Sequence, residues 1–247
     1  AVRQAAAAKA AEAARQEAER QRQAAAAELS RCRKFRGDNC VIAISSEHPR
    51  EELEKRKTTL LTVTHLTLVG NGFFLARENG DSFWSGLPSN LVDRLKEKGL
   101  WTKGAVKYVA AGPNSQYFAD VGGEIWWSGT CSDSFANAAK ASRSISKVAF
   151  GEDYSWIVLY ADGGSAWEGI PTALHNKLSG RGKKLPPPVE VALGLNSTWY
   201  VKFKDGKNDY SLHLTVADSY QAWANAGWTV RNVVLNSENG DWLLRYT

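Results

Sequence analysis

The sequence predicts a mainly β repeat protein, a five-bladed β-propeller preceded by a long N-terminal α-helix. Three observations support this class. A short motif recurs about every 42 residues, each copy contains a turn between apolar stretches, and the first 36 residues differ sharply in composition from the rest. Such a period indicates a chain built from one supersecondary unit, which buries its apolar face against its neighbours. We therefore divide the chain into residues 1–36 and a repeat domain, residues 37–247.

Residues 1–36 are expected to form a basic, Ala-rich helix or linker. Residues 1–30 consist almost wholly of Ala, Gln, Arg, Glu and Lys, which are the strongest helix formers. Only Val2 and Leu29 are large and apolar, so this helix has little surface with which to join a core. The segment holds nine basic and four acidic side chains and thus the whole net charge of +5, since the other 211 residues carry 22 of each sign.

The repeated motif begins with Gly or Asn and contains two aromatic positions separated by a turn. The opening residues are Gly70, Gly112, Gly151, Gly194 and Asn236. The first aromatic position holds Phe74, Tyr117, Trp156, Trp199 and Trp242. The turns are Asn79-Gly80, Gly122-Gly123, Asp162-Gly163 and Asp205-Gly206. The second aromatic position holds Trp84, Trp127, Trp167 and, more loosely, Tyr210.

Each unit is predicted to contain three strands and a short helix. Apolar, β-branched stretches such as residues 106–112 and 189–194 favour a first strand, and the opening Gly permits the positive φ of a tight turn. Alternating residues then favour a second strand, and Asp-Gly or Asn-Gly suits the hairpin that leads to the third. Pro88 and Pro171 suit the start of a helix. The helices are expected to bury Leu87, Leu91, Leu95, Ile170, Leu174 and Leu178.

The fifth unit stops after two strands, and residues 40–60 are expected to complete it. Cys40–Ser46 has the pattern of a strand, and residues 48–57 match the helical stretch 87–96, with Pro49 in the place of Pro88. Sharing one unit between the two ends of the chain leaves no sheet edge exposed, as in a closed propeller. A linear solenoid of five units is the alternative that the sequence leaves open.

The third copy of the repeated unit resembles the repeats of a known family. Val148-Ala149, Gly151, Asp162-Gly163, Trp167 and Gly169 resemble the repeats of RCC1-type propellers, and five short units are similar to tachylectin-like propellers. The resemblance covers about 200 residues at the level of the repeat pattern. Such folds include lectins, exchange factors and scaffolds, so the resemblance implies binding rather than one activity.

The sequence contains no set of residues that indicates catalysis or a cofactor. The Asp residues before Gly are explained by turns, the four His lack metal-ligand spacing, and the nucleophile and phosphate-binding motifs are missing. We therefore expect a non-enzymatic protein-interaction or scaffold subunit without a cofactor. The alternative is a lectin with one aromatic-lined site per repeat, at Trp84, Trp127 and Trp167. Trp156, Trp199 and Trp242 are expected to pack between units.

The N-terminal segment is the predicted partner-binding surface, which tethers the propeller to a larger assembly. Its basic residues could meet an acidic protein surface, RNA or anionic lipid. The residues are Arg15, Arg20, Arg22, Arg31, Arg33, Lys34 and Arg36.

The compartment is predicted only broadly. Cys32, Cys40 and Cys131 form no disulfide framework, although Cys32 and Cys40 could pair in an oxidising compartment. Neither a secretory signal nor an apolar run long enough to span a bilayer is evident, which favours an intracellular or organellar protein. Because the sequence begins at Ala1 and contains no Met, we expect translation to start upstream.

Overall fold

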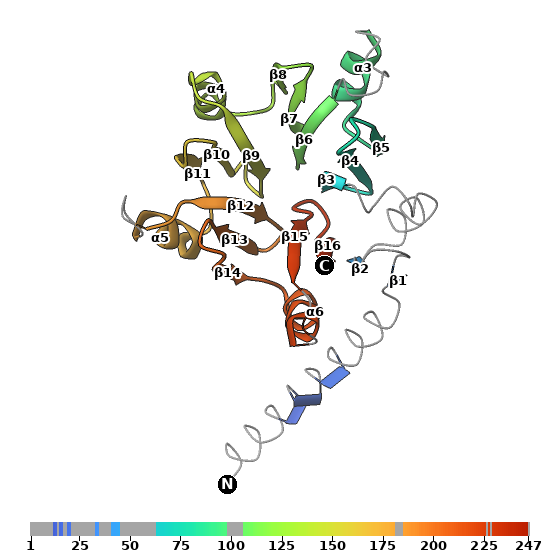
Figure 1. Ribbon diagram of the computed structural model, residues 1–247, viewed down its shortest axis with the longest axis vertical. Coiled ribbons are helices and arrows are strands. Elements are labelled where there is room, and N and C mark those ends of the chain that lie inside the picture. Colours follow the sequence, from blue (N-terminus) through green and yellow to red (C-terminus); the bar gives the residue numbers. More distant parts are fainter. Residues whose placement is uncertain are drawn as a thin grey trace.

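The computed structural model describes five small antiparallel sheets, arranged as blades are in a β-propeller (Figure 1). It describes residues 63–97, 106–180, 185–225, 227 and 229–246, six residues between 12 and 20, and the backbone of Arg33–Lys34 and Val41–Ile44. Four sheets have three strands and one has four. The prediction of a mainly β chain is therefore confirmed for this part of the sequence.

Four consecutive units each contain a three-stranded sheet followed by a helix. Unit 1 contains β3 (Val63–Val69), β4 (Gly72–Arg77), β5 (Ser82–Ser85) and α3 (Ser89–Glu97). Unit 2 contains β6 (Val106–Gly112), β7 (Gln116–Val121), β8 (Glu124–Trp127) and α4 (Asp133–Lys140). Unit 3 contains β9 (Ile145–Phe150), β10 (Trp156–Tyr160), β11 (Ser165–Glu168) and α5 (Thr172–Gly180). Unit 4 contains β12 (Pro188–Leu193), β13 (Trp199–Phe203), β14 (Asn208–Ser211) and α6 (Leu214–Asn225).

Unit 5 joins strands from both ends of the chain. Its order is β1 (Arg33–Lys34), β2 (Val41–Ile44), β16 (Trp242–Tyr246), β15 (Val230–Leu235). Because β16 pairs with β2 in antiparallel register, the prediction that residues around 40–46 complete the last sheet is confirmed. The helix expected at residues 48–57 lies outside the described residues.

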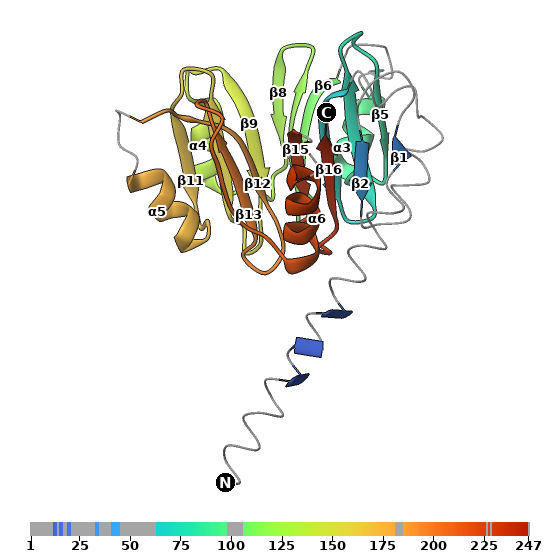
Figure 2. The same ribbon diagram turned by 60° about the horizontal axis from the view of Figure 1, so that its bottom comes forward.

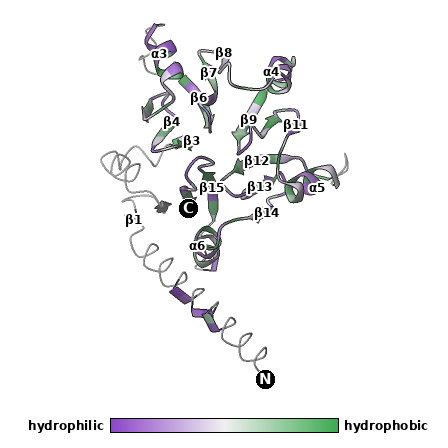
Figure 3. Ribbon diagram, turned by 180° about the vertical axis from the view of Figure 1, so that it is seen from behind, coloured by the Kyte–Doolittle hydropathy of each residue, from purple (hydrophilic) through white to green (hydrophobic). Residues whose placement is uncertain are grey.

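The first strands of the five units contact one another around a common axis. β3 contacts β6, β6 contacts β9, β9 contacts β12, and β12 contacts β15. The sequence of contacts ends where it began, because β15 also contacts β3. Figure 2 shows the strands standing side by side around this axis, and Figure 3 shows hydrophobic residues concentrated in them rather than in the helices.

Five hydrophobic clusters form the core, and each joins two neighbouring units. Between units 1 and 2, for example, Leu91 and Leu95 of α3 pack in one cluster with Val109 and Tyr117 of unit 2. The closing pair follows the same rule, since Leu75 of unit 1 shares a cluster with Leu243 of unit 5. The faces of these sheets are therefore buried between units rather than within one unit.

Three of the repeated tryptophans pack between units, as expected. Trp156, Trp199 and Trp242 are only 3–4% exposed, and each belongs to a cluster shared with the preceding unit. In unit 1 the first aromatic position of the repeat is occupied by Phe73 rather than Phe74. Phe73 pairs with Leu68 in the same way as Trp156 pairs with Phe150 in unit 3. Phe74 instead packs toward unit 2.

The buried leucines of the helices have the expected spacing. A helix also forms in unit 2, where the sequence motif is weak. Leu91, Leu95 and Leu174 are fully buried. α4 forms without the Gly-Leu-Pro motif, because the Ser132 hydroxyl caps its N-terminus by accepting from Phe135 N, and Phe135 takes the buried position. Among the described residues, no helix is long and apolar enough to cross a membrane.

The expected role of the opening glycines is wrong at three of four positions. Gly70 has a positive φ of 50°, but Gly112, Gly151 and Gly194 are not in the left-handed region. Instead, a Cβ on Gly112 would lie 2.3 Å from Cβ of Phe150 in the next unit. Equivalent Cβ atoms on Gly151 and Gly194 would meet leucines of the following unit at 3.2 and 3.0 Å. Glycine thus permits neighbouring first strands to approach closely.

This packing predicts a specific loss of stability. Gly112→Ala should lower the free energy of unfolding by about 1–3 kcal/mol, because the added methyl overpacks the contact with Phe150. The matched control is Gly129→Ala, since Gly129 has no atom within 4 Å of its ideal Cβ and no positive φ. Urea unfolding of both variants tests the prediction, and equal stabilities would contradict it.

Candidate functional site: a polar ring in the central channel

A β-bulge occurs at the same place in the first strand of every unit. In unit 2, Val106 and Tyr108 pair with adjacent residues of β7, so that Lys107 is the inserted residue. The inserted residues of the five units are Thr64, Lys107, Ser146, Val189 and Arg231. All five are exposed. Bulges re-aim the side chains beside them and are common near functional sites.

The residue after each bulge is polar and half-buried, and we call these five residues the channel ring. They are His65, Tyr108, Lys147, Glu190 and Asn232. All five line one cavity of about 60 Å³ on the axis, together with apolar residues of the same strands. By volume, the cavity has room for a few water molecules or one compact polar group.

Sequence reasoning missed this ring, although a signal for it exists. Each ring residue lies four or five positions before the opening Gly or Asn, as a polar residue in a largely apolar strand. The four His lack metal-ligand spacing, so nothing in the sequence around His65 singles it out. The pattern is hard to see because the five positions hold five different residue types.

Ring residues bind the units to one another. His65 Nε2 donates to the carbonyl oxygen of Val109 at 2.6 Å, and its ring stacks on Tyr108 with centroids 3.9 Å apart. The Tyr108 hydroxyl donates to the Val148 carbonyl at 3.0 Å and accepts from Val148 N at 2.8 Å. Asn232 Nδ2 donates to Glu190 Oε1 at 3.1 Å. These bonds join unit 1 to 2, unit 2 to 3, and unit 5 to 4.

Arg245 of β16 joins the last unit to the first on the same side of the structure. Its guanidinium donates to the carbonyl oxygen of Val63 in β3. Arg245 also pairs in register with Asn232, so it lies beside the ring. The polar contacts of the ring therefore continue across the junction between units 5 and 1.

Burial dominates the electrostatics of the ring. It lowers the pKa of His65 to about 3, helped by the positive charge of Lys147, so the imidazole is neutral near pH 7. Burial also lowers the pKa of Lys147, against the attraction of Glu190. It raises the pKa of Glu190, against Lys147 and the hydrogen bond from Asn232. Burial raises the pKa of Tyr108, which stays neutral.

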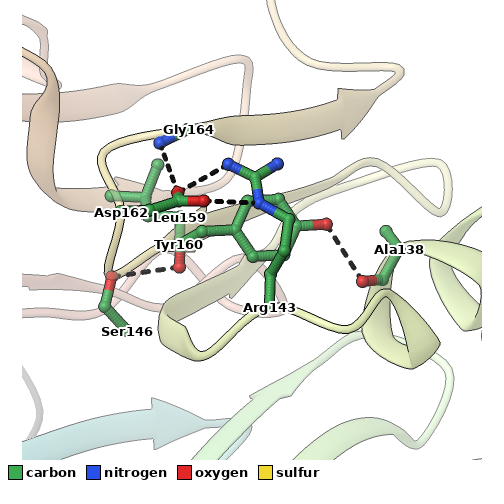
Figure 4. Close-up of polar contacts among 7 residues, drawn as sticks. All are labelled: Ala138, Arg143, Ser146, Leu159, Tyr160, Asp162 and Gly164. Carbon is green, nitrogen blue, oxygen red and sulfur yellow. Dashed lines mark hydrogen bonds and ion pairs between the residues drawn. The ribbon is translucent and has the colours of Figure 1, made fainter.

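The bulge of unit 3 illustrates how the surrounding turns are held (Figure 4). The Ser146 hydroxyl donates to the carbonyl oxygen of Leu159 across the bulge at 3.0 Å. Arg143 donates to both carboxylate oxygens of Asp162, at 2.8 and 2.5 Å, and lies 3.9 Å over the Tyr160 ring. Asp162 also accepts from Gly164 N at 2.9 Å, which confirms that this carboxylate serves the turn.

The opposite end of the channel is covered by the loop that opens unit 5. Asn236 Nδ2 donates to the carbonyl oxygen of Gly70 in unit 1 at 2.6 Å. Ser237 Oγ donates to the carbonyl oxygen of Phe150 in unit 3 at 3.1 Å, and both polar side chains are buried. The loop therefore reaches two other units, and access to the ring is from the side with the exposed bulge residues.

The predicted basic residues that the structure describes do not line this site. Arg15 and Arg20 are helical and exposed, while Arg22, Arg31 and Arg36 lie outside the described residues. Arg33 and Lys34 differ from the expectation of a helix or linker through residue 36, because β1 pairs with β2. The sheet hydrogen bonds available at residues 41–44 explain this difference. The proposed partner-binding role of all seven residues stays a prediction.

The predicted lectin residues lie in three separate units. Trp84, Trp127 and Trp167 are half-buried and each packs against a hydrophobic cluster. Trp167 alone of the three also lines one of the described grooves, of about 450 Å³, with Trp156, Ser134 and Glu168. Within the described ranges, no group of three His, Cys, Asp or Glu side chains is placed to hold a metal ion.

Comparisons with known proteins add no family name. No protein-family model and no curated protein matches the chain. Similar solved structures include Prp20p from Saccharomyces cerevisiae, described with its binding to Gsp1p and histones, and virginiamycin B lyase from Staphylococcus aureus.

These two alignments are distant. Prp20p is 14% identical with a TM-score of 0.40, over 75% of this chain and 56% of its own. The lyase is 9% identical with a TM-score of 0.22, over 72% of this chain and 60% of its own. The chain thus spans less than two thirds of either protein, and its fold rests on the sheets and contacts described above.

The neutral state of His65 predicts a dependence of stability on pH. An unfolded histidine titrates near pH 6.5 and His65 near 3, so the unfolded chain binds more protons between these values. The free energy of unfolding should therefore fall as the pH decreases from about 6.5 toward 3, with His65 contributing up to about 1.4 kcal/mol per pH unit. His65→Gln should remove this part of the slope.

The matched control for this prediction is His213→Gln. His213 is exposed and hydrogen bonds only within its own turn, to Thr215 Oγ1 at 3.1 Å. Urea unfolding at several pH values compares the two variants with the parent protein. Parallel slopes for all three proteins would refute the burial of a neutral His65.

Proposed function

We propose that the chain is a closed, five-bladed β-propeller that acts as a non-enzymatic protein-interaction module. The observation that carries this proposal is the arrangement of unit 5, in which both ends of the chain share one sheet and β1 is its outermost strand. A ring of units fastened in this way is a rigid platform, and β1 at its outer edge follows the basic segment in the sequence.

The use of the ring residues supports binding rather than catalysis. His65, Tyr108 and Asn232 each make a hydrogen bond to a neighbouring unit. A general acid or base needs a proton that it can exchange with a substrate at the working pH. His65, with its pKa of about 3, and Tyr108, with its raised pKa, are poorly suited to that task.

The charge distribution supports a tether. Residues 1–36 carry the net charge of +5, whereas the repeat domain is neutral overall. Charge concentrated on an appendage attracts an acidic surface at long range without disturbing the platform. We infer that the basic segment anchors the protein to a larger assembly, while the propeller presents its loops and helices to a second partner.

A lectin is the second candidate function, and one observation favours it. The groove at Trp167 combines an indole ring with Ser134 and Glu168, the mixture of apolar and polar groups that small-ligand sites use. Trp84 and Trp127 line none of the described grooves, so a site in every unit has less support. A glycan screen without any ligand would remove this alternative.

Photo-cross-linking of the full-length chain tests the interaction proposal. A photoreactive residue in place of Gln16, which is exposed on the basic helix, should yield a discrete cross-linked product in cells that make the protein. The same group in place of Lys177, exposed on α5, is the positional control, because any product formed there should not depend on Arg15, Arg20 and Arg22. Joint substitution of Arg15, Arg20 and Arg22 by Gln should weaken the product at position 16, because the attraction is electrostatic. A product unaffected by this change, or none at all, would contradict the proposed tether.

A further inference from the structure

Positive charge gathers at the open end of the channel, although the repeat domain as a whole is neutral. Lys147 belongs to the channel ring. Lys107 and Arg231 are exposed bulge residues, and each lies one position before another residue of that ring. Lys202 and Arg245 pair in register with the ring residues Glu190 and Asn232. Acidic residues at the same level are Glu190 and Asp120, which pairs with Tyr108. Among the described residues, this level therefore holds five cations and two carboxylates.

Lys147 differs from the other ring residues in its contacts. Its Nζ lies 5.8 Å from the centroid of the Tyr108 ring, a weak cation–π contact. Within the described part of the chain, no hydrogen-bond acceptor or ion-pair partner contacts its ammonium group. A half-buried ammonium group without an acceptor is costly unless an anion or ordered water completes it.

Glu190 does not cancel the positive charge of Lys147. Its Oε1 already accepts from Asn232, and its carboxylate interacts with both Lys147 and Lys202. Its positive neighbours therefore outnumber it, and Arg245 adds a further positive charge that acts on Lys147. Low-dielectric walls around a narrow cleft strengthen such a field.

We propose that the channel mouth binds an oxyanion of the carboxylate or phosphate class, with Lys147 Nζ as its principal contact. The cavity of about 60 Å³ admits one such compact group and excludes bulky ligands. The exposed Lys107 adds positive charge that attracts the anion toward the channel. The anion is either a small ion or a carboxylate at the surface of a protein partner, and these share the same chemistry.

The titration behaviour of the mouth sets the sign of its pH dependence. Lys147 must be protonated to hold an anion, and burial lowers its pKa. Affinity therefore falls as the pH rises and the ammonium group loses its proton. Protonation of Glu190, whose pKa is raised, removes repulsion and increases affinity as the pH falls. His65 and Tyr108 stay neutral near pH 7, and Lys202 and Arg245 are the basic residues that pair in register with Glu190 and Asn232.

Titration calorimetry at low ionic strength tests the site on the full-length protein. The probes are inorganic phosphate, acetate, and a short peptide with a free C-terminal carboxylate beside the same peptide amidated. Lys147→Gln should weaken binding by at least about tenfold, as expected for loss of a charge-assisted hydrogen bond. The control Lys204→Gln removes an exposed lysine of the β13–β14 turn and should leave affinity unchanged.

Two further measurements keep the test independent of how Lys147→Gln folds. Glu190→Gln should tighten binding several-fold, because the amide oxygen can still accept from Asn232 while the repulsion is lost. Affinity of the unaltered protein for acetate should decrease as the pH rises and Lys147 loses its proton. Binding of phosphate or acetate identifies a small-ion site, and binding of the free-carboxylate peptide alone identifies a partner's carboxylate. Absence of binding by every probe, or equal affinity in the parent and Lys147→Gln proteins, would overturn the proposal.

Discussion

Every unit of this protein depends on its neighbours for burial of its apolar faces. The five hydrophobic clusters each span two units, so a unit at either end of an open array would leave one face in water. The contact between β15 and β3, the pairing of β2 with β16, and the hydrogen bond from Asn236 to Gly70 all remove such an end. The contact between the first and last units is therefore the constraint on which the burial of these faces depends.

The close approach of the first strands explains both the glycines and the channel. Gly112, Gly151 and Gly194 let each first strand reach the next at one end of the axis. At the other end, the bulges turn one polar residue per unit toward the axis, where it bonds across the junction or faces the cavity. The close approach of the first strands thus also concentrates ionisable groups at one cavity, which makes it a candidate site in a repeat without a catalytic motif.

Much of the fold could be predicted from the sequence, because turns and helices depend on local chemistry. Asp162-Gly163, Leu91 and Leu174 each indicate their structure within a few residues. The use of residues 40–46 in the last sheet could also be predicted, since an incomplete repeat at one end matched a surplus at the other. The positive φ expected at Gly151 was wrong because the true reason for glycine there is a contact with another unit. The channel ring was missed for a similar reason. Lys147 and Glu190 share neither residue type nor local motif, and only the meeting of five strands at one axis brings them together.

The distance between the two ends of the repeat tests closure most directly. Spin labels at Asn71 and Asn239, which are both exposed, can be introduced after the native cysteines are replaced by serine. Because Asn239 Nδ2 lies 2.9 Å from the carbonyl oxygen of Gly70, electron spin resonance should detect strong dipolar coupling between the two labels. Labels separated by the length of five stacked units, with no short-distance population, would contradict a closed ring.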